Sequence, residues 1–303
     1  MKIGKMKRNV QFESLPDGFQ VLIGGRTFTR FVTRNSIPKP IFHPVFTPSG
    51  LAVTRRVPEI DGGDAVTDHP HHRGLWCGHG SVNGTDFWEE YRPDHGNIRT
   101  EYVSYKSDGD TGLILITAIW EDAGGSKIVR EHRTCRVFGT AEANIMDIDL
   151  CLAPIHSAVT FGDTKEGGLV AVRLAPMMIA EKTGCIFNAD GQMYSANTPG
   201  TEETWGKRSR WCAYYGQPVE GQTATVAIIH RPDGFRFPTW WHVRAYGLFT
   251  ANPFGQSFFE SDTTPPPCGQ WTVAPGESLS TSYRIIIADG ELSAARIAEL
   301  EGL

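Results

Sequence analysis

Most of the chain consists of segments in which apolar and polar residues alternate, divided by turns rich in glycine and proline. In residues 146–152 the even positions are apolar, whereas Asp147 and Asp149 have the opposite parity. Successive side chains of a strand point to opposite faces of a sheet, so this alternation predicts a half-buried β-strand. Similar segments predict strands at 19–23, 113–120, 127–138, 169–174, 223–230 and 281–288.

The order of these segments argues against a parallel sheet with crossover helices, because no long helical pattern alternates with the strands. We therefore predict an all-β protein, a large antiparallel β-sandwich that forms a single domain over residues 1–303. One short helix is expected near the C-terminus, at 293–300, where Ile297 and Leu300 lie on the same helical face. We expect this helix to cover an edge of a sheet.

Charge and composition argue against two classes of partner. Lys and Arg number 29 against 34 Asp and Glu, a net charge of −5, so the chain lacks the basic excess that attracts nucleic acid. No apolar run approaches the ~20 residues that span a bilayer, and the N-terminus lacks the apolar core of a signal peptide. Six scattered cysteines without a CxxC pair are typical of reduced thiols. We expect a cytoplasmic protein with neither a nucleic-acid nor a membrane partner.

The densest group of chemically active side chains lies at residues 67–80, which include His69, His71, His72 and His79. If this segment is extended, His69 and His71 point to one side and His72 to the other, because the side-chain period of a strand is two. The expected placement of the rings leaves three interpretations open.

In the first interpretation, His69 and His71 bind a divalent metal and Asp68 orients one ring from behind. In the second, one histidine is a general acid or base and Arg73 binds a substrate oxygen. In the third, the rings only hydrogen-bond the loop backbone. A metal needs further ligands that the sequence does not identify, so we assign no metal ligands and keep a divalent ion open as a cofactor.

Four more segments concentrate polar and aromatic residues, and each has a functional and a structural interpretation. Segment 81–90 includes Asp86 and Trp88, and the ring of Trp88 is either a face on which a sugar stacks or a core residue. Segment 161–168 is a loop with charged residues that either point into a cleft or form a salt-bridged hairpin tip. Cations stand between aromatic residues in segment 204–215, and polar residues interrupt an apolar strand in segment 235–255. The candidates in these three segments are Lys165, Glu166, Lys207, His242 and Arg244.

These segments together resemble a known family, the soluble bacterial proteins called the PmoA family or DUF6807. The resemblance extends from about Lys39 to Asp289 and rests on the strings DHPHHRGLWCGHG, NGTDFW, FGDTKEGG, WGKRSRWC and FPTWWHVRAYGLFTANPFG. It implies a role in carbohydrate catabolism. At the level of fold the chain is also similar to the galactose-mutarotase supersandwich, in which a histidine acid and a carboxylate base act on a sugar at the open face of a large sheet.

We therefore expect a carbohydrate-processing enzyme that acts by proton transfer on a small-molecule sugar or keto-sugar, as an epimerase or as a lyase or hydratase. The alternatives are a non-catalytic carbohydrate-binding protein, and a metal-dependent lyase or oxygenase that uses His69 and His71. The expected catalytic residues are His69, His71, His72, Arg73, Glu166, Lys207 and His242. The expected substrate contacts are His79, Asp86, Trp88, Lys165 and Arg244. We expect the loops at 69–72 and 163–166 to converge with His242 on one cavity.

Overall fold

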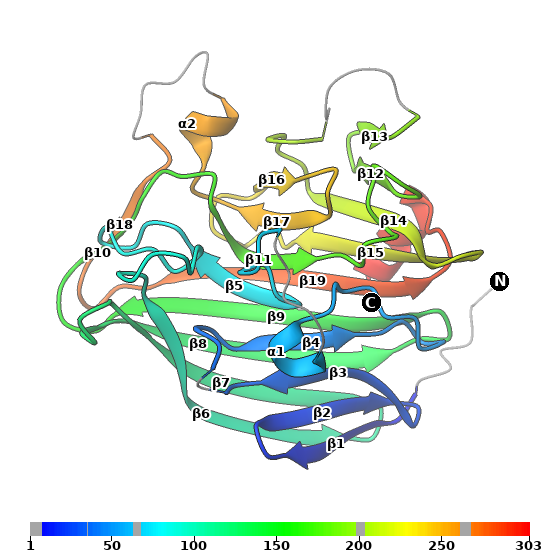
Figure 1. The fold of residues 1–303 in the computed structure, drawn as a ribbon, viewed down its shortest axis with the longest axis horizontal. Coiled ribbons are helices and arrows are strands. Elements are labelled where there is room, and N and C mark those ends of the chain that lie inside the picture. Colours follow the sequence, from blue (N-terminus) through cyan, green and yellow to red (C-terminus); the bar gives the residue numbers. More distant parts are fainter. Residues whose placement is uncertain (1–7, 35, 63–67, 198–203, 261–267) are drawn as a thin grey trace.

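Two antiparallel sheets packed face to face make up most of the molecule (Figure 1). The computed structural model describes residues 8–34, 36–62, 68–197, 204–260 and 268–303. The first sheet has eight strands, in the order β1 (Val10–Leu15), β2 (Gly18–Ile23), β3 (Arg26–Val32), β4 (Ile41–Val45), β5 (Leu75–His79), β11 (Gly167–Arg173), β17 (Leu248–Asn252) and β16 (Trp240–Val243).

The second sheet has nine strands, in the order β13 (Met193–Ser195), β12 (Cys185–Asn188), β14 (Trp211–Val219), β15 (Gln222–His230), β19 (Leu279–Asp289), β9 (Ala143–Pro154), β8 (Lys127–Gly139), β7 (Thr111–Glu121) and β6 (Asn97–Asp108). Two short strands, β10 (Val159–Phe161) and β18 (Trp271–Val273), pair separately. The described helices are α1 (Pro58–Asp61), α2 (Gln256–Phe259) and α3 (Ala294–Glu301).

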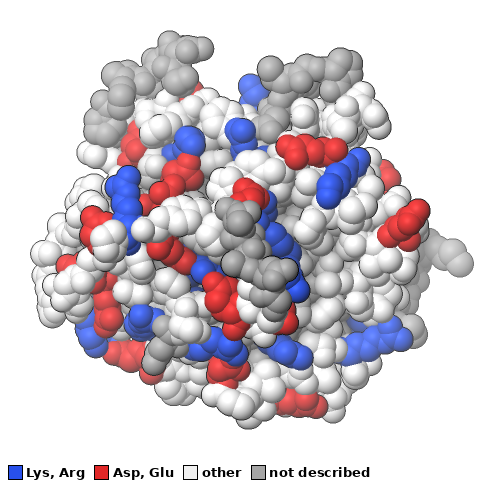
Figure 2. Space-filling model, in the orientation of Figure 1, with Lys and Arg blue, Asp and Glu red and all other residues white. Residues whose placement is uncertain are grey.

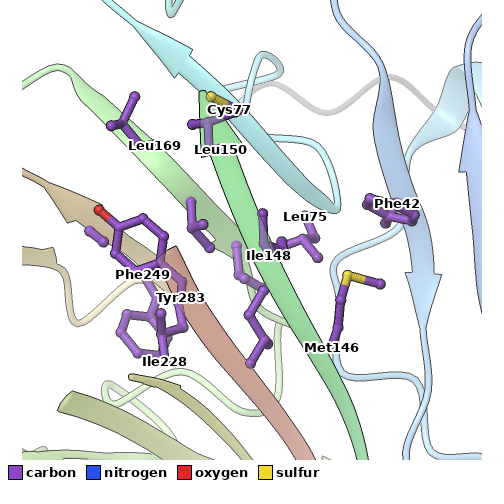
Figure 3. Close-up of a cluster of buried hydrophobic side chains, with 14 of the residues drawn as sticks. Phe42, Leu75, Cys77, Met146, Ile148, Leu150, Leu169, Ile228, Phe249 and Tyr283 are labelled. Carbon is purple, nitrogen blue, oxygen red and sulfur yellow. The ribbon is translucent and has the colours of Figure 1, made fainter. Parts of the chain in front are cut away.

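The main core lies between the two sheets, and every second side chain of a strand points into it. Met146, Ile148 and Leu150 of β9 point into it, together with Phe42 and Leu75 of the first sheet (Figure 3). None of these five side chains is more than 4% exposed. Burying a side chain of this size stabilises the fold by about 1.5–3 kcal/mol. The alternation in the sequence therefore reports which residues face the opposite sheet.

The prediction of an all-β antiparallel sandwich with a short C-terminal helix is confirmed. The segments predicted to be strands coincide with β2, β7, β8, β9, β11, β15 and β19, and only Leu174 of segment 169–174 lies just beyond its strand. Within the described ranges, no helix is both long enough and apolar enough to cross a membrane.

The C-terminal helix forms where it was predicted, but the expectation that it covers a sheet edge is wrong. Ile297 and Leu300 of α3 pack against Ile145, Ile229 and Ile286, which belong to three adjacent strands in the middle of the nine-stranded sheet. The helix thus covers a sheet face and not an edge. These strands are apolar at their outward positions as well as their inward ones, so the outer face also needs a cover.

Candidate functional site

The candidate site lies on the outer face of the eight-stranded sheet, over β5, β11, β17 and β16, and we call this surface the polar face. Ala171 pairs with Trp76 on one side and Thr250 on the other, and Thr250 pairs with His242. Residues that pair directly across adjacent strands point to the same side of the sheet, so Trp76, Ala171, Thr250 and His242 share one face. Leu75 has the opposite parity and faces the core. In Figure 2 a row of Lys and Arg side chains runs along the middle of this face.

The Asp68 carboxylate joins a histidine to an arginine at the centre of the polar face. Its Oδ1 accepts a hydrogen bond from Nδ1 of His69, and its Oδ2 forms an ion pair with Arg173. With Nδ1–H donated to the carboxylate, the lone pair of the imidazole is on Nε2. The His69 side chain is 42% exposed, so this ring is accessible from solvent. The pair has the arrangement of a carboxylate that orients a histidine base.

Charges around Asp68 keep it ionised. Partial burial alone would raise the pKa of its carboxyl group. The hydrogen bond from His69 and the guanidinium of Arg173 outweigh that effect, so the pKa of Asp68 lies below its ordinary value. The ionised carboxylate is therefore an acceptor for the Nδ1–H of His69.

The loop that contains His69 is a turn, which corrects the expectation based on an extended segment. His69 has a φ of +44°, in the left-handed region, and its carbonyl accepts a hydrogen bond from the backbone N–H of His72 at 3.0 Å. The rings of His69 and His72 consequently stack with their centroids 4.9 Å apart. His69 also stacks on Tyr246 at 5.0 Å, and His72 stacks on Trp76 at 5.5 Å. A turn thus brings together rings that an extended chain would separate.

Arg55 holds this turn in place. It donates from Nη1 to the carbonyl of Asp68 at 2.7 Å, and from Nη2 to the carbonyls of His69 at 2.7 Å and His72 at 3.0 Å. Sequence reasoning missed both Arg55 and Arg173. Arg173 could have been found from the sequence, because it is a charged residue at the end of an otherwise apolar strand. In the structure it is only 4% exposed. Arg55 lies outside every residue cluster in the sequence.

His71 and His72 are buried, and both are neutral at physiological pH. Burial, and then the positive charge of Lys39, lowers the pKa of His71 to about 2. Burial also lowers the pKa of His72 well below its ordinary value. His71 Nδ1 lies 2.8 Å from the hydroxyl of Tyr91, and His72 Nδ1 lies 3.3 Å from Nη1 of Arg173. Neither ring is suited to donating a proton as an imidazolium.

A second histidine occupies the other end of the polar face. His242 donates from Nδ1 to the carbonyl of Lys165 at 2.6 Å, which leaves the lone pair of the ring on Nε2. Burial lowers the pKa of His242 to about 4, although the nearby Glu166 carboxylate acts in the opposite direction. Glu166 is paired with Nζ of Lys165 at 2.5 Å. The structure therefore brings His242, Lys165 and Glu166 together, as expected.

Tyr246, which stacks on His69, lies beside two arginines. The guanidinium of Arg173 lies 4.7 Å from the centroid of its ring, and that of Arg244 lies 5.9 Å away. Arg244 also lies 5.8 Å from the ring of Trp205, whose centroid is 6.3 Å from that of His242. Burial raises the pKa of Tyr246 to about 12, so its hydroxyl stays protonated. Sequence reasoning missed Tyr246, which lies beside two arginines that are distant from each other in sequence.

The expected single cavity is only partly formed. A cavity of about 440 Å³ opens beside the His69 turn. It is lined by Arg55, Asp68, Arg173, Leu174, Pro176, Ile179, Glu181 and Tyr246. His69 itself is not among the lining residues, although its neighbour Asp68 is, and Glu166 and His242 are not either. Trp76 on β5 and His242 on β16 lie three strand spacings apart. At ~4.8 Å for each spacing, these two positions are about 14 Å apart.

Arg73 has a different role from the one predicted. Its guanidinium forms ion pairs with Glu90 and, at 2.9 Å, with Glu59. Glu90 also pairs with Nζ of Lys39 at 2.6 Å. The Arg73 side chain is 10% exposed and already holds two carboxylates. Arg73 therefore fixes the covering loops and is not available to bind a substrate oxygen.

Three expected substrate contacts are structural instead. His79 is fully buried on the core side of β5, where it donates from Nε2 to the carbonyl of Gly162 at 2.8 Å. Trp88 is fully buried under the covering loops, so its ring offers no face to a sugar. Oδ1 of Asp86 accepts hydrogen bonds from the backbone N–H groups of Trp88, at 2.7 Å, and Glu89, at 2.9 Å, and so fixes a turn. Trp88 is buried because its loop folds back over the sheet, which alternation within a strand cannot show.

Lys207 lies near His242 through its backbone. Its carbonyl accepts a hydrogen bond from the N–H of Trp241 at 3.0 Å, and its side chain is exposed. Among the described residues, no group of three His, Cys, Asp or Glu is arranged to hold a metal ion. The rings of His69 and His71 have centroids 5.8 Å apart, and their Nδ1 atoms contact Asp68 and Tyr91. Binding of a divalent ion to this pair stays a prediction.

Comparison with known proteins identifies a family and a fold. Residues 18–301 match the family described as "Family of unknown function (DUF6807)". No curated protein sequence gives a significant match.

Among solved structures, the α-galactosidase AgaB from Geobacillus stearothermophilus is 8% identical with a TM-score of 0.52, and the match covers 94% of this chain and 41% of that enzyme. The α-galactosidase AgaA from the same organism, in complex with 1-deoxygalactonojirimycin, is 9% identical with a TM-score of 0.51, and the match covers 93% and 40%. This chain thus spans about two fifths of the length of either enzyme. A galactose 1-epimerase from Lactobacillus acidophilus is 8% identical with a TM-score of 0.39, and the match covers 94% and 99%.

Proposed function

The chain belongs to the DUF6807 family, and we propose that it is a carbohydrate-processing enzyme that transfers a proton to or from a sugar or keto-sugar. The observation on which this proposal depends is the pairing of Asp68 with His69. The carboxylate fixes the tautomer of the ring, Arg173 keeps the carboxylate ionised, and the side chain remains 42% exposed. A structural histidine needs partners for its ring nitrogens but does not need an accessible lone pair.

In the proposed reaction, Nε2 of His69 removes a proton from a carbon next to a carbonyl, and the electron pair of that C–H bond moves onto the carbonyl oxygen to form an enolate. The charge that develops on His69 is balanced by Asp68. His242 does not line the cavity, and burial lowers its pKa to about 4, so the proposed reaction uses His69 as its proton-transfer group. Such a group suits an epimerisation, or an elimination or hydration, beside a carbonyl.

The substrate class is a proposal that draws on the sandwich fold, which this chain shares with parts of the two α-galactosidases. A cytoplasmic location is likewise proposed from the thiols. All six cysteines are free, at Cys77, Cys135, Cys151, Cys185, Cys212 and Cys268. Free thiols of this number are typical of a reducing compartment.

The test is hydrogen exchange into the sugar. A panel of aldoses and keto-sugars is incubated with the protein in D₂O, and loss of each C–H signal is followed by proton NMR. We expect exchange with the wild-type protein and a loss of about 100-fold or more in His69→Asn and Asp68→Asn. The matched control is His156→Asn, because His156 is an exposed histidine in the turn after β9.

Two results would overturn the proposal. Full exchange in His69→Asn would remove His69 from the reaction. Saturable sugar binding without exchange on any substrate would indicate a carbohydrate-binding protein. Exchange that a chelator abolishes and a stoichiometric divalent ion restores would instead favour the metal-dependent alternative that uses His69 and His71.

A further inference from the structure

The cavity beside His69 has more buried positive charge than buried negative charge. Arg55 and Arg173 are 8% and 4% exposed, and both contact the carboxylate of Asp68, at 3.4 Å for Arg55. Asp68 also accepts the hydrogen bond from His69. The other carboxylate of the cavity belongs to Glu181, which is exposed. Two buried guanidinium groups therefore share one carboxylate, whereas buried charges are usually matched one to one.

Hydrogen bonding of Arg173, of Arg55 and of the rings packed behind the His69 turn shows the same imbalance. Arg173 has five N–H groups, and among the described residues only Asp68 and His72 accept hydrogen bonds from them. Because Nδ1 of His72 accepts from Arg173, the ring proton of His72 is on Nε2, and this buried N–H has no partner in the described structure. The buried Nε of Arg55 and Nε1 of Trp76 are also without described partners. All these atoms are donors, so acceptors are short among the described groups at and behind the cavity wall.

The two cations also repel one another. Burial lowers the pKa of Arg55 to about 10, and the charge of Arg173 acts in the same direction. An anion bound between them would relieve this repulsion. A cavity of about 440 Å³ is within the range of small-molecule sites, which is roughly 300–1,000 Å³.

Building on the proposed function, we infer that the substrate is an acidic sugar, whose carboxylate or phosphate oxygens are bound by Arg173 in the cavity while its reacting carbon lies beside His69. The planar guanidinium of Arg173 suits either kind of oxyanion. Arg55 contributes positive charge and holds the turn, so it positions the site. The anionic group also anchors the sugar at a fixed distance from the histidine, which places one carbon for proton transfer.

Isothermal titration calorimetry on the full chain tests this inference by binding alone. The probes are glucuronate, gluconate and a hexose phosphate, with glucose as the neutral parent. We expect at least one acidic probe to bind about tenfold or more tightly than glucose, and this preference to weaken as salt is raised. The carboxylate and phosphate probes distinguish the two sources of the oxyanion.

Variants then assign the preference to Arg173. Arg173→Met is expected to abolish it, and Arg173→Lys to keep part of it, because lysine retains the charge but loses the planar fork. The matched control is Arg130→Met, which removes an exposed arginine from the nine-stranded sheet. Circular dichroism and thermal unfolding check that each variant is folded. If Arg173→Met does not fold, the salt dependence of the wild-type protein and the Arg173→Lys result decide.

The inference is overturned if no acidic probe binds, if glucose binds as tightly as the acidic sugars, or if Arg173→Met keeps the preference. Its failure is distinguishable from failure of the proposed function. Binding of acidic sugars through Arg173 without hydrogen exchange supports the site and contradicts the catalysis. Hydrogen exchange on neutral sugars, with no preference that depends on Arg173, supports the catalysis and contradicts the acidic substrate.

Discussion

On the outer face of each sheet a buried arginine pairs with an aspartate, and the two arginines differ in how completely their hydrogen bonds are satisfied. On the nine-stranded sheet, Arg284 donates from Nε and Nη2 to the two oxygens of Asp147, at 2.6 and 2.7 Å. Its Nη1 donates to the carbonyl of Leu300 at 2.8 Å. On the eight-stranded sheet, Arg173 shares Asp68 with Arg55 and His69.

This difference separates a structural pair from a functional one. Arg284 is 2% exposed, and its guanidinium donates hydrogen bonds from Nε and both Nη atoms. The bond to Leu300 links the end of α3 to the sheet. Around Arg173 the unpartnered groups are donors, and the carboxylate belongs to a side chain that is 53% exposed. We call a pair saturated when the fold supplies partners for its hydrogen-bonding groups, and unsaturated when buried donors around it lack partners. A saturated pair cannot bind a ligand, whereas an unsaturated pair beside a cavity can.

The largest effect is expected from breaking the saturated pair. Arg284→Met leaves the buried carboxylate of Asp147 without its bidentate partner and frees the end of α3. We expect the free energy of unfolding to fall by about 3–5 kcal/mol, measured by urea denaturation. Sugar binding by the fraction that remains folded should not change. A loss below about 1 kcal/mol would contradict the structural role assigned to this pair.

The next largest effect is the pH dependence of stability caused by His79, a buried histidine on the core side of the eight-stranded sheet. Burial lowers the pKa of His79 to about 4, whereas an unfolded histidine titrates near 6.5. Between these values the unfolded state binds more protons, so stability falls as the pH drops from 6.5 toward 4. At pH 5 the contribution of His79 to this loss is about 2 kcal/mol.

His79→Gln tests the effect of pH, because glutamine can still donate to the carbonyl of Gly162 but does not titrate. We expect the loss of stability between pH 7 and pH 5 to be smaller by about 2 kcal/mol in the variant, measured by urea denaturation at each pH. His230, whose pKa burial also lowers to about 4, should keep a residual pH dependence in the same window. An unchanged slope in His79→Gln would mean that His79 does not stay neutral in the folded protein.

A smaller effect is expected when the unsaturated pair is broken. Arg173→Met leaves Asp68 with Arg55 and His69, and the Asp68 side chain is half exposed to water. We expect a loss of about 1 kcal/mol in the free energy of unfolding, well below that of Arg284→Met. Equal losses in the two variants would remove the distinction between the pairs, whatever their effects on binding.

The sandwich could be predicted from the sequence because the alternation of apolar and polar residues within one strand identifies the face that is buried. The parity of Met146, Ile148 and Leu150 is enough to orient β9, and no distant residue is needed to read it. The site was predicted in part for the opposite reason. His69 and His242 were recognised from their own segments, but the turn at His69 is fixed by Arg55, which is 14 positions away in the chain.

The remaining errors have the same physical origin. His79 and Trp88 were assigned to the substrate because they lie near other functional residue types in the sequence, yet one points into the core and the other lies under a loop. Strand parity could have separated His79 from Trp76, since they are an odd number of residues apart on β5. Nothing local indicates how the loop with Trp88 folds over the sheet.

The smallest effect is expected from an ion pair that neither sheet buries. Arg130 pairs with Glu101 at 2.8 Å on the outer surface of the nine-stranded sheet, and the two side chains are 42% and 43% exposed. Water already solvates both charges, so we expect Arg130→Ala to change the free energy of unfolding by about 0.5 kcal/mol or less and to leave sugar binding unchanged. Urea denaturation and calorimetry measure the two quantities. A loss comparable to that of Arg173→Met would show that the stability effect of an arginine here does not depend on burial, and the contrast between the buried pairs would then need another explanation.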